Sequence, residues 1–374
     1  MIFENKRILV TGGTGSLGQV LVRRLLSGKD GLPAKIIVFS RDEAKQHFMR
    51  LEYQQKAAAA VETSGNGFHK RKELRSRMAA TDEVIYNNFR QRLEFRIGDV
   101  RDYHAVGGAL HDVDIVFNAA ALKQVPTCEY FPFEAVRTNI EGPENIIRAI
   151  QSQRLPVETV IGISTDKACK PVNAMGMTKA LQERIFIQAN MRCDQTRFVC
   201  ARYGNVLASR GSVIPLFHEQ ITSGGPVTIT SPDMTRFLLS LDDAVDTIFA
   251  AVREGQAGET YIPRVPSALV THIAQSLIGN RKISIKIVGV RPGEKIHEIL
   301  VSEEEAHRTI ARGAYYVIRP MLPELCSDNS GDGSVVTEYS SGDNVMSAKE
   351  TARMLQDRRL TVEDVGQEHQ EVLR

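Results

Sequence analysis

The sequence predicts an α/β fold, namely a Rossmann-like, doubly wound parallel sheet followed by a smaller C-terminal lobe. Short apolar runs alternate with helical stretches in the first half of the chain, and a glycine-rich turn joins the first run to the first helix. After about residue 205 the alternation gives way to segments punctuated by glycine and proline. With 374 residues and 42% apolar composition, the chain is long enough for about two domains with real cores, which excludes general disorder.

Six segments are predicted to be strands of the main sheet. Each is short and nearly all apolar, as is typical of parallel strands buried on both faces. They are residues 8–10, 36–39, 93–97, 115–117, 160–163 and 198–201. Apolar residues recur at helical spacing over 17–25, so the opening unit is strand, glycine turn, helix, strand. Pro143 lies in a stretch that should be helical, and we expect that helix to kink there or to begin late.

The chain is expected to have three parts. A nucleotide-binding Rossmann domain spans 1–205, a smaller lobe spans 206–326, and a C-terminal loop and helical tail span 327–374. Residues 52–92 separate the second strand from the third and read as an insertion with an alanine run, a Ser-Gly-Asn-Gly turn and a basic stretch. A solvated helical face with a loop is the favoured interpretation, and an element that binds a partner or forms an oligomer is the alternative.

Charge, cysteine content and hydropathy exclude several classes of function. The 47 basic and 45 acidic residues leave a net charge of +2, too small to recruit nucleic acid or an anionic membrane. Five cysteines are odd in number and form no C-x-x-C pair, which argues against a disulfide framework or a bound metal. No apolar run approaches the ~20 residues that span a bilayer, and no signal peptide is apparent. We therefore expect a cytoplasmic protein that binds neither nucleic acid nor a membrane.

A nucleotide-binding turn is predicted between the first strand and the first helix. Three glycines have G-x-x-G-x-x-G spacing, and the absence of side chains lets a pyrophosphate reach the backbone N–H groups at the helix N-terminus. A strand before the turn and a helix after it distinguish this motif from an ordinary tight turn. The predicted contacts are Gly12, Thr14, Gly15, Ser16, Leu17 and Gly18.

The end of the second strand predicts which dinucleotide binds. Sites that prefer NAD usually place a carboxylate there, but this chain reads Phe39-Ser40-Arg41-Asp42. A hydroxyl followed by a guanidinium suits a 2′-phosphate, so NADP is favoured over NAD, with Asp42 one residue later as the argument for NAD. After the third strand, Asp99 and Val100 are predicted to lie near the adenine. A role for Asp99 as a helix cap or turn residue is an equal alternative.

Three further polar clusters follow the next strands, at the edge where doubly wound folds bind ligands. They are residues 118–123, residues 138–142, and residues 164–167 with 173–179. Together with the glycine turn, these motifs resemble those of extended short-chain dehydrogenases/reductases, specifically the soluble UDP-N-acetylglucosamine 4,6-dehydratases of the inverting type, from surface-polysaccharide biosynthesis. The likeness covers nearly the whole chain apart from 52–92. It implies further cofactor contacts from Ala119, Ala120, Lys123, Asn139 and Lys179.

The resemblance also draws attention to a missing tyrosine. In that superfamily a Y-x-x-x-K motif supplies a tyrosine that exchanges the hydroxyl proton and a lysine that holds the nicotinamide ribose. Here Met175 stands at the tyrosine position, with Lys179 four residues later. A thioether cannot exchange protons at neutral pH, so simple alcohol oxidation by the usual route is disfavoured, although some family members also carry methionine there. Ordinary core packing is the alternative role for Met175.

Thr165-Asp166-Lys167 carries the resemblance to dehydratases. A Thr-Asp-Glu triplet performs the elimination in related nucleotide-sugar dehydratases, and lysine replaces the glutamate in the inverting branch. The implied reaction moves a hydride from sugar C4 to NADP, removes water across C5 and C6, and returns the hydride to C6. Asp166, protonated in a desolvated pocket, is the predicted acid, and Lys167, its pKa lowered by burial and by nearby Lys179, is the predicted base. A surface ion pair is the alternative interpretation.

Motifs of the smaller lobe resemble the family's nucleotide-sugar contacts, which makes it the expected substrate-binding lobe. The two phosphates of a UDP-sugar need local cations in a near-neutral protein, and arginine is their best geometric match. The implied contacts with the UDP-sugar are Lys123, Asn205, Val213, Arg236, Arg291 and Glu294. A UDP-sugar 4-epimerase and a non-catalytic NADP-binding sensor or scaffold are the competing hypotheses. The resemblance also implies a homo-oligomer.

Overall fold

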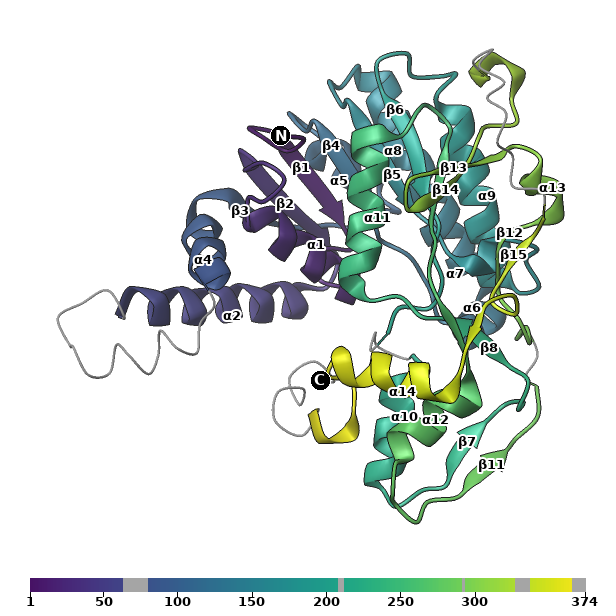
Figure 1. Cartoon of the computed structure of the whole chain (residues 1–374). Helices are drawn as coiled ribbons and strands as arrows, with labels where there is room; N and C mark the ends of the chain where they lie inside the picture. The colour runs from purple at the N-terminus through teal and green to yellow at the C-terminus, as the bar shows by residue number, and fades with distance from the viewer. Residues whose placement is uncertain (63–79, 208–211, 291–292, 327–336, 365–374) are drawn as a thin grey trace.

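The computed structural model describes residues 1–62, 80–207, 212–290, 293–326 and 337–364. Its main element is a nine-stranded sheet with the order β13-β14-β9-β6-β5-β4-β1-β2-β3 (Figure 1). All six predicted strands are present in it. The strands are β1 (Arg7–Thr11), β2 (Lys35–Ser40), β3 (Leu93–Ile97), β4 (Ile115–Asn118), β5 (Thr159–Ile163), β6 (Arg197–Ala201), β9 (Thr260–Pro263), β13 (Thr309–Arg312) and β14 (Tyr315–Ile318).

The strand order has the reversal that defines a doubly wound fold. β1 pairs in parallel with both β2 and β4, so that Val10 lies opposite Val38 on one side and Phe117 on the other. The chain moves outward from β1 to β3 and then returns to β4, which leaves a crevice at the carboxyl ends of β1 and β4. β9 continues the parallel sheet, and β14 and β13 close it as antiparallel strands. The predicted fold class is confirmed.

Helices cover both faces of the sheet, and each face has its own apolar core. Leu21 of α1 and Ile248 of α11 pack with Ile8 and Val10 in the first core. Ile147 of α8 and Phe186 of α9 pack with Leu9 and Val160 in the second. Alternate residues of β1 thus enter opposite cores, as expected for a strand buried on both faces. The covering helices are α1 (Ser16–Leu26) and α11 (Leu241–Glu254) on one face, and α5 (Tyr103–Ala109), α8 (Gly142–Gln153) and α9 (Ala174–Ala189) on the other.

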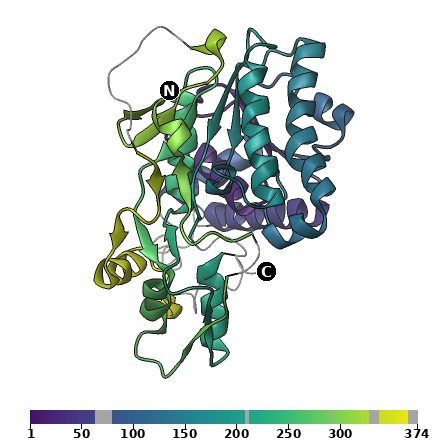
Figure 2. The same ribbon diagram turned by 90° about the vertical axis from the view of Figure 1, so that its right-hand side faces the viewer.

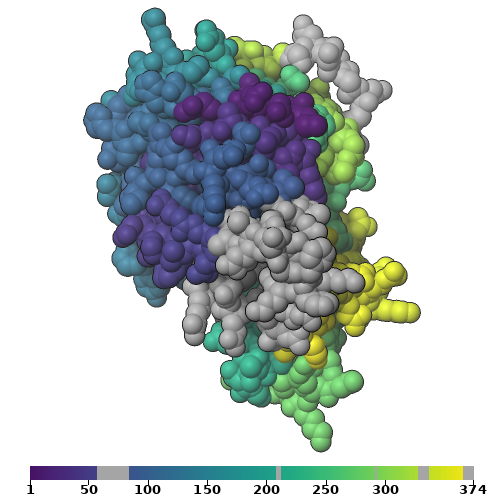
Figure 3. All heavy atoms as spheres, turned by 90° about the vertical axis from the view of Figure 1, so that its left-hand side faces the viewer, coloured from purple at the N-terminus to yellow at the C-terminus, as the bar shows by residue number. Residues whose placement is uncertain are grey.

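The predicted insertion contributes two packed helices. α2 (Glu43–Glu62) extends away from the sheet and α4 (Ala80–Arg92) returns toward β3 (Figure 1). Figure 3 views this side of the molecule from outside. Tyr53 stacks on Phe89 with ring centroids 5.2 Å apart, which ties the base of α2 to α4. The Ser-Gly-Asn-Gly turn and the basic stretch lie outside the described residues, so a role in binding partners stays a prediction.

The second lobe lies beneath the sheet, at the ends toward which its parallel strands point (Figure 2). Its core is formed by apolar residues that include Phe217, Ile273 and Leu355. The helices are α10 (Val213–Thr222), α12 (Val270–Ile278) and α14 (Ala348–Asp357). The strands are β7 (Val227–Ile229), β8 (Thr235–Phe237), β10 (Ser267–Leu269), β11 (Ile285–Ile287) and β16 (Val345–Met346). β12 (Ile299–Val301) and β15 (Tyr339–Ser340) form a separate pair, and Leu300 of β12 packs with Ile262 and Ile318 of the main sheet.

The division into three consecutive parts stays a prediction. In the structure, some segments of the second part belong to the main sheet, and a helix of the third part packs on the second lobe. α11, β9, β13 and β14 lie beyond residue 205 yet complete the main sheet and its helical cover. α14, from the C-terminal part, packs on α12 of the second lobe. No helix in the described part of the chain is both long and apolar enough to cross a membrane.

The segment before α8 shows the expected effect of Pro143. α7 (Pro132–Val136) passes into a π-helical turn, η1 (Arg137–Glu141), before α8 begins at Gly142. Pro143 then occupies the first turn of α8, where the missing N–H costs nothing. The wider π turn carries Asn139, and α6 (Val125–Tyr130) precedes it.

Candidate active site

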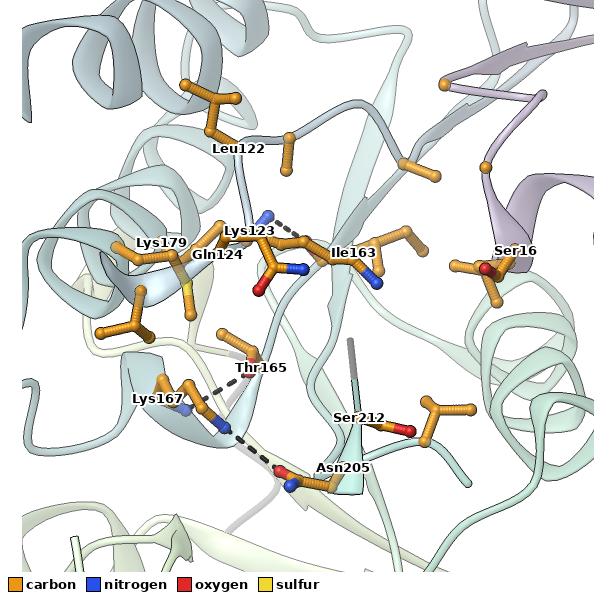
Figure 4. A pocket seen from close by; sticks show the side chains of 18 of the residues that line it. Ser16, Leu122, Lys123, Gln124, Ile163, Thr165, Lys167, Lys179, Asn205 and Ser212 are labelled. Carbon is orange, nitrogen blue, oxygen red and sulfur yellow. Dashed lines mark hydrogen bonds between the residues drawn. The ribbon is translucent and has the colours of Figure 1, made fainter. Parts of the chain in front are cut away.

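A cavity of about 800 Å³ lies between the carboxyl ends of the sheet and the second lobe. Every predicted site residue lines it except Asn139, which is buried behind its wall, and Arg291, which lies outside the described residues. Figure 4 shows Ser16 on one side of the cavity, Lys167 and Lys179 on the other, and Lys123 between them. Residues that are far apart in sequence therefore share one site. Among the described residues, no group of three or more His, Cys, Asp or Glu side chains could hold a metal ion.

The glycine turn has the geometry that a pyrophosphate requires. Gly12 has a φ of +66°, and a Cβ there would lie 2.8 Å from the backbone nitrogen of Ala120. A Cβ on Gly18 would lie 2.5 Å from Cα of Gly13, so this glycine lets α1 pack against the turn. Gly15 is the N-cap of α1, and no acidic side chain occupies the first turn of the helix. The helix N-terminus therefore fits a phosphate anion.

The end of the cavity next to β2 and β3 contains more charge than expected. Ser40 Oγ lies 3.0 Å from Thr14 Oγ1, and the half-exposed Arg41 lies 3.7 Å from a carboxylate oxygen of Asp99. The Asp42 carboxylate contacts Lys45 at 2.6 Å, and this contact lowers the pKa of Asp42. Lys45 also lines the cavity, so the carboxylate that argued for NAD is neutralised by a lysine that the sequence analysis did not identify.

Arg101 fixes the Asp99 side chain. Arg101 donates to both carboxylate oxygens, at 3.0 and 2.7 Å. Partial burial raises the pKa of Asp99, but the hydrogen bonds from Arg101 outweigh burial and lower it. Asp99 is thus held as a carboxylate by a neighbour two residues away, while it still lines the cavity.

Asn139 supports the cavity wall from behind. Its side-chain oxygen accepts from Leu122 N at 2.8 Å, and its side-chain nitrogen donates to Leu122 O at 3.0 Å and to Thr178 Oγ1 at 3.0 Å. These bonds connect the side-chain amide of Asn139 to the loop that carries Lys123 and to α9. Asn139 is fully buried and its amide is already hydrogen-bonded, and its expected contact with the cofactor stays a prediction.

The Thr165-Asp166-Lys167 triplet follows β5 and begins a short helix, η2 (Asp166–Ala168). The Asp166 side chain is 1% exposed, and its Oδ1 accepts from Thr165 Oγ1 at 2.8 Å and from Lys167 Nζ at 3.0 Å. Lys167 Nζ also donates to Asn205 Oδ1 at 3.2 Å, a contact drawn in Figure 4. Asp166 Oδ2 is buried and has no hydrogen-bond partner among the described residues. The pair is therefore buried at the cavity, unlike a surface ion pair.

The predicted direction of the Lys167 pKa shift is wrong. Burial lowers the pKa of Lys167, but the carboxylates of Asp166 and Glu298 outweigh burial and raise it above its ordinary value. Lys167 is therefore an ammonium group in the free protein. Lys179 is the lysine whose pKa falls, to about 8, because of burial. Its Nζ donates to Ile163 O at 2.5 Å and to Gln182 Oε1 at 2.7 Å.

Met175 lies in the first turn of α9, close to the triplet. Asn173 caps this helix by accepting from Gly176 N at 2.8 Å. A Cβ on Gly176 would lie 2.2 Å from Lys167 O, so the glycine lets α9 begin directly against η2. Met175 is 4% exposed, lines the cavity and packs against Cys128. It thus combines core packing with a position at the cavity.

The segment after β6 contributes Asn205 to the cavity, and the second lobe contributes Val213, Arg236 and Glu294. Arg236 is 8% exposed, and its guanidinium donates to the backbone carbonyls of Thr235 at 2.6 Å, Ile296 at 3.2 Å and Lys295 at 3.1 Å. These bonds fix the guanidinium within its own lobe and use several of its donors. Its predicted contact with a phosphate stays a prediction.

Sequence reasoning missed two charged features around the triplet. Glu298 is buried beside Lys167 and Arg236 and lines the cavity. Arg202 lies after β6 and bridges Glu183 of α9 and Glu305 of α13 (Glu303–Ala306) behind the triplet. The only sequence signal for Glu298 was its place four residues after Glu294. Nothing local indicated the pairing of Arg202, because its partners are 19 and 103 residues away.

Comparisons with known proteins agree with this architecture. The sequence profile of the polysaccharide biosynthesis protein family matches residues 8–66 and 66–320. A protein named UDP-glucose 4-epimerase from Rickettsia bellii (strain OSU 85-389) is 43% identical over 323 residues, covering 85% of this chain and 84% of that protein. The crystal structure of Pen from Bacillus thuringiensis covers 96% of this chain and 100% of its own, with 30% identity and a TM-score of 0.80.

A more distant solved structure shows the same fold. DesIV, a dTDP-glucose 4,6-dehydratase from Streptomyces venezuelae with NAD and TYD bound, covers 78% of this chain and 86% of its own, with 22% identity and a TM-score of 0.59. The fold and the cavity thus define an extended short-chain dehydrogenase/reductase. Within that class, the chain belongs to the polysaccharide biosynthesis protein family of nucleotide-sugar dehydratases and epimerases.

Proposed function

We propose that this enzyme is an NADP-dependent dehydratase that converts UDP-N-acetylglucosamine to a UDP-4-keto-6-deoxy sugar, with inversion at C5, for surface polysaccharide or glycoconjugate biosynthesis. The observation that carries the proposal is the buried contact between Asp166 and Lys167 at the cavity, with a methionine at the position of the usual tyrosine. An elimination needs an acid and a base at adjacent carbons, and this pair has both groups 3.0 Å apart. Cytoplasmic location and a homo-oligomer stay predictions.

The glycine turn, Ser40 and Arg41 are the residues that would hold NADP. When bound, NADP supplies the acceptor for the hydride from C4 and the source of the hydride to C6, so no net reductant is consumed. The remaining chemistry is proton transfer by side chains of this chain. Lys45 beside Asp42 supports NADP over NAD, because it offsets the carboxylate that would repel a 2′-phosphate.

The raised pKa of Lys167 defines how the pair would work. Transfer of the ammonium proton to Asp166 Oδ1, across the 3.0 Å contact, gives a carboxylic acid beside an amine. A bound sugar excludes water, which favours this neutral pair over two buried charges. Asp166 then protonates the departing C6 hydroxyl while Lys167 takes the C5 proton. Elimination thereby regenerates the original ion pair and releases water.

A UDP-sugar 4-epimerase is the second candidate, because proteins 41–43% identical to this chain carry the name UDP-glucose 4-epimerase. The two reactions differ in product mass, since a dehydratase removes one water and an epimerase removes none. Incubation with UDP-N-acetylglucosamine and then with UDP-glucose, followed by mass spectrometry, separates them. A product of unchanged mass in which C4 is inverted would establish the epimerase. Recovery of the substrate without any change would leave the non-catalytic sensor or scaffold as the remaining hypothesis.

Arg41→Ala is expected to weaken NADP binding far more than NAD binding. The lost contact is with the 2′-phosphate, and removal of a charge-assisted hydrogen bond costs about 1.5–3 kcal/mol. Calorimetric titration of the purified protein with each dinucleotide measures both affinities. Arg137→Ala, at an exposed position outside the cavity, is the matched control. Equal weakening of NADP and NAD would contradict the placement of Arg41 at the 2′-phosphate.

Met175→Leu is expected to keep most of the activity, whereas Lys167→Met is not. Leucine preserves the apolar volume against Cys128, and such exchanges usually cost under about 1.5 kcal/mol of stability. If Lys167, through Thr165 or a water, also handles the C4 hydroxyl proton, Lys167→Met stops the first half-reaction as well. Single-turnover reduction of the bound dinucleotide by the substrate measures this step. Reduction of the bound dinucleotide in Lys167→Met would assign the C4 proton to another group, with Lys123 the next residue to test.

A further inference from the structure

A second carboxylate faces the Lys167 amine from the other lobe. Glu298 directly precedes β12, its side chain is 4% exposed, and its Oε1 lies 3.5 Å from Lys167 Nζ. The same oxygen lies 3.7 Å from Arg236 Nε. Glu298 lies outside the motifs on which the proposed function depends, yet it lines the same cavity. It therefore connects the triplet of the Rossmann domain with the second lobe.

Glu298 is fixed on its own side. Its backbone N donates to Ser341 Oγ at 2.9 Å, and its carbonyl accepts from Ser341 N at 2.8 Å. Arg236, which is close to its carboxylate, is itself held by three backbone carbonyls. Lys167, by contrast, has a flexible side chain that is 24% exposed. Glu298 is thus held in place, whereas the Lys167 amine beside it can move.

The charges around Lys167 balance. Asp166 and Glu298 supply two carboxylates, and Lys167 and Arg236 supply two cations, from three separate segments. Glu298 Oε2 is buried and has no hydrogen-bond partner among the described residues, like Asp166 Oδ2. An unpartnered carboxylate oxygen in a buried site is costly unless nearby cations compensate. The position of the Lys167 ammonium is therefore favoured by both carboxylates.

We infer that Glu298 is a positioning residue of this site: its carboxylate, 3.5 Å from Nζ, holds the Lys167 amine against the cavity. The inference rests on the proposed function, in which Lys167 becomes the base. A carboxylate 3.5 Å away favours the ammonium form and so delays the loss of the proton that the pair delivers to the departing hydroxyl. The rate of dehydration should therefore fall at alkaline pH, as that proton is lost. Asp166, Glu298 and Arg236 are the charged groups that act most strongly on this proton.

Glu298→Gln keeps the shape and removes the charge. We expect the alkaline fall of kcat to move to lower pH by about one unit, because one of the two carboxylates that favour the ammonium is lost. We also expect the limiting kcat to fall by roughly 10-fold to 10²-fold, since the amine is less well placed, with a smaller change in KM. Glu298→Asp keeps the charge on a shorter side chain, so its kcat should fall while the midpoint stays within a few tenths of a pH unit.

The matched control is Glu259→Gln. Glu259 is also buried and pairs with Arg312 at 2.8 Å, but it does not line the cavity. Its substitution removes a buried carboxylate of the same kind and should leave the pH profile in place. Thermal unfolding checks that each variant is folded. If Glu298→Gln does not fold, Glu298→Asp tests the inference, and a shifted midpoint in that variant would contradict it.

A measurement independent of turnover separates this inference from the proposed function. The rate at which a small acylating reagent modifies Lys167, followed by peptide mass spectrometry over pH, reports loss of its proton directly. Glu298→Gln should move that midpoint to lower pH even if the wild-type protein produces no dehydrated sugar. An unchanged midpoint and kcat would overturn the inference alone. Loss of solvent-deuterium exchange at C5 at every pH, in folded Glu298→Gln with normal Lys167 modification, would instead make Glu298 the base.

Discussion

Asp166→Asn is expected to slow the loss of water from UDP-N-acetylglucosamine by a factor on the order of 10² or more. Asparagine keeps the size and the contact with Thr165 but cannot accept the Lys167 proton or deliver a proton to the departing hydroxyl. The measurement is the rate of appearance of the product that is lighter by one water. Solvent deuterium at C5 of that product reports on proton removal.

The control for this variant is Asp114→Asn. Asp114 lies just before β4, at the opposite end of that strand from the cavity, where it accepts from Arg7 N at 2.7 Å. The asparagine oxygen can still accept that bond, so the rate should stay near that of the wild type. A near-normal rate in folded Asp166→Asn would give Asp166 a structural role and remove the acid from the proposed mechanism.

Arg202→Met is expected to destabilise the protein by about 3–5 kcal/mol, because it leaves two buried carboxylates without their cation. Arg202 contacts Glu183 at 2.6 Å and Glu305 at 2.7 Å, and its own side chain is 3% exposed. Ser164, directly before the Thr165-Asp166-Lys167 triplet, also donates from its Oγ to Glu183. The free energy of unfolding from chemical denaturation measures the effect. Adding Glu183→Gln and Glu305→Gln to Arg202→Met should recover part of the loss.

The cost of Arg202→Met should shrink in acid. Burial raises the pKa of Glu305, but the charge of Arg202 outweighs burial and lowers it to about 2. A lowered carboxylate pKa contributes stability that is present above the unfolded value of 4.5 and is lost as the pH falls toward 2. Without Arg202, Glu305 takes up a proton at higher pH and its charge no longer opposes folding. A difference from wild type that stays constant from neutral pH to pH 3 would contradict this assignment.

The sequence by itself determined the sheet and the place of the site. Six apolar runs correspond to β1 to β6 because strands buried on both faces need apolar residues throughout. The positions of Gly12, Gly15 and Gly18 reflect a local steric requirement, which the spacing reveals directly. Thr165, Asp166 and Lys167 were predicted to reach the cavity because they follow a parallel strand at the edge where such sheets bind ligands.

Only the tertiary structure decided the pKa shifts and the hydrogen-bond partners of the residues at the site. Lys167 carries a raised pKa because Glu298, 131 positions away, adds its charge to that of Asp166. Asn139 supports the wall, and Arg236 is held by backbone carbonyls of a segment 60 residues away. Motif spacing is a property of neighbouring residues, whereas a pKa or a free donor depends on every charged or polar group within a few ångströms, whatever its distance in sequence. That difference explains why the site was located from sequence but its electrostatics was not.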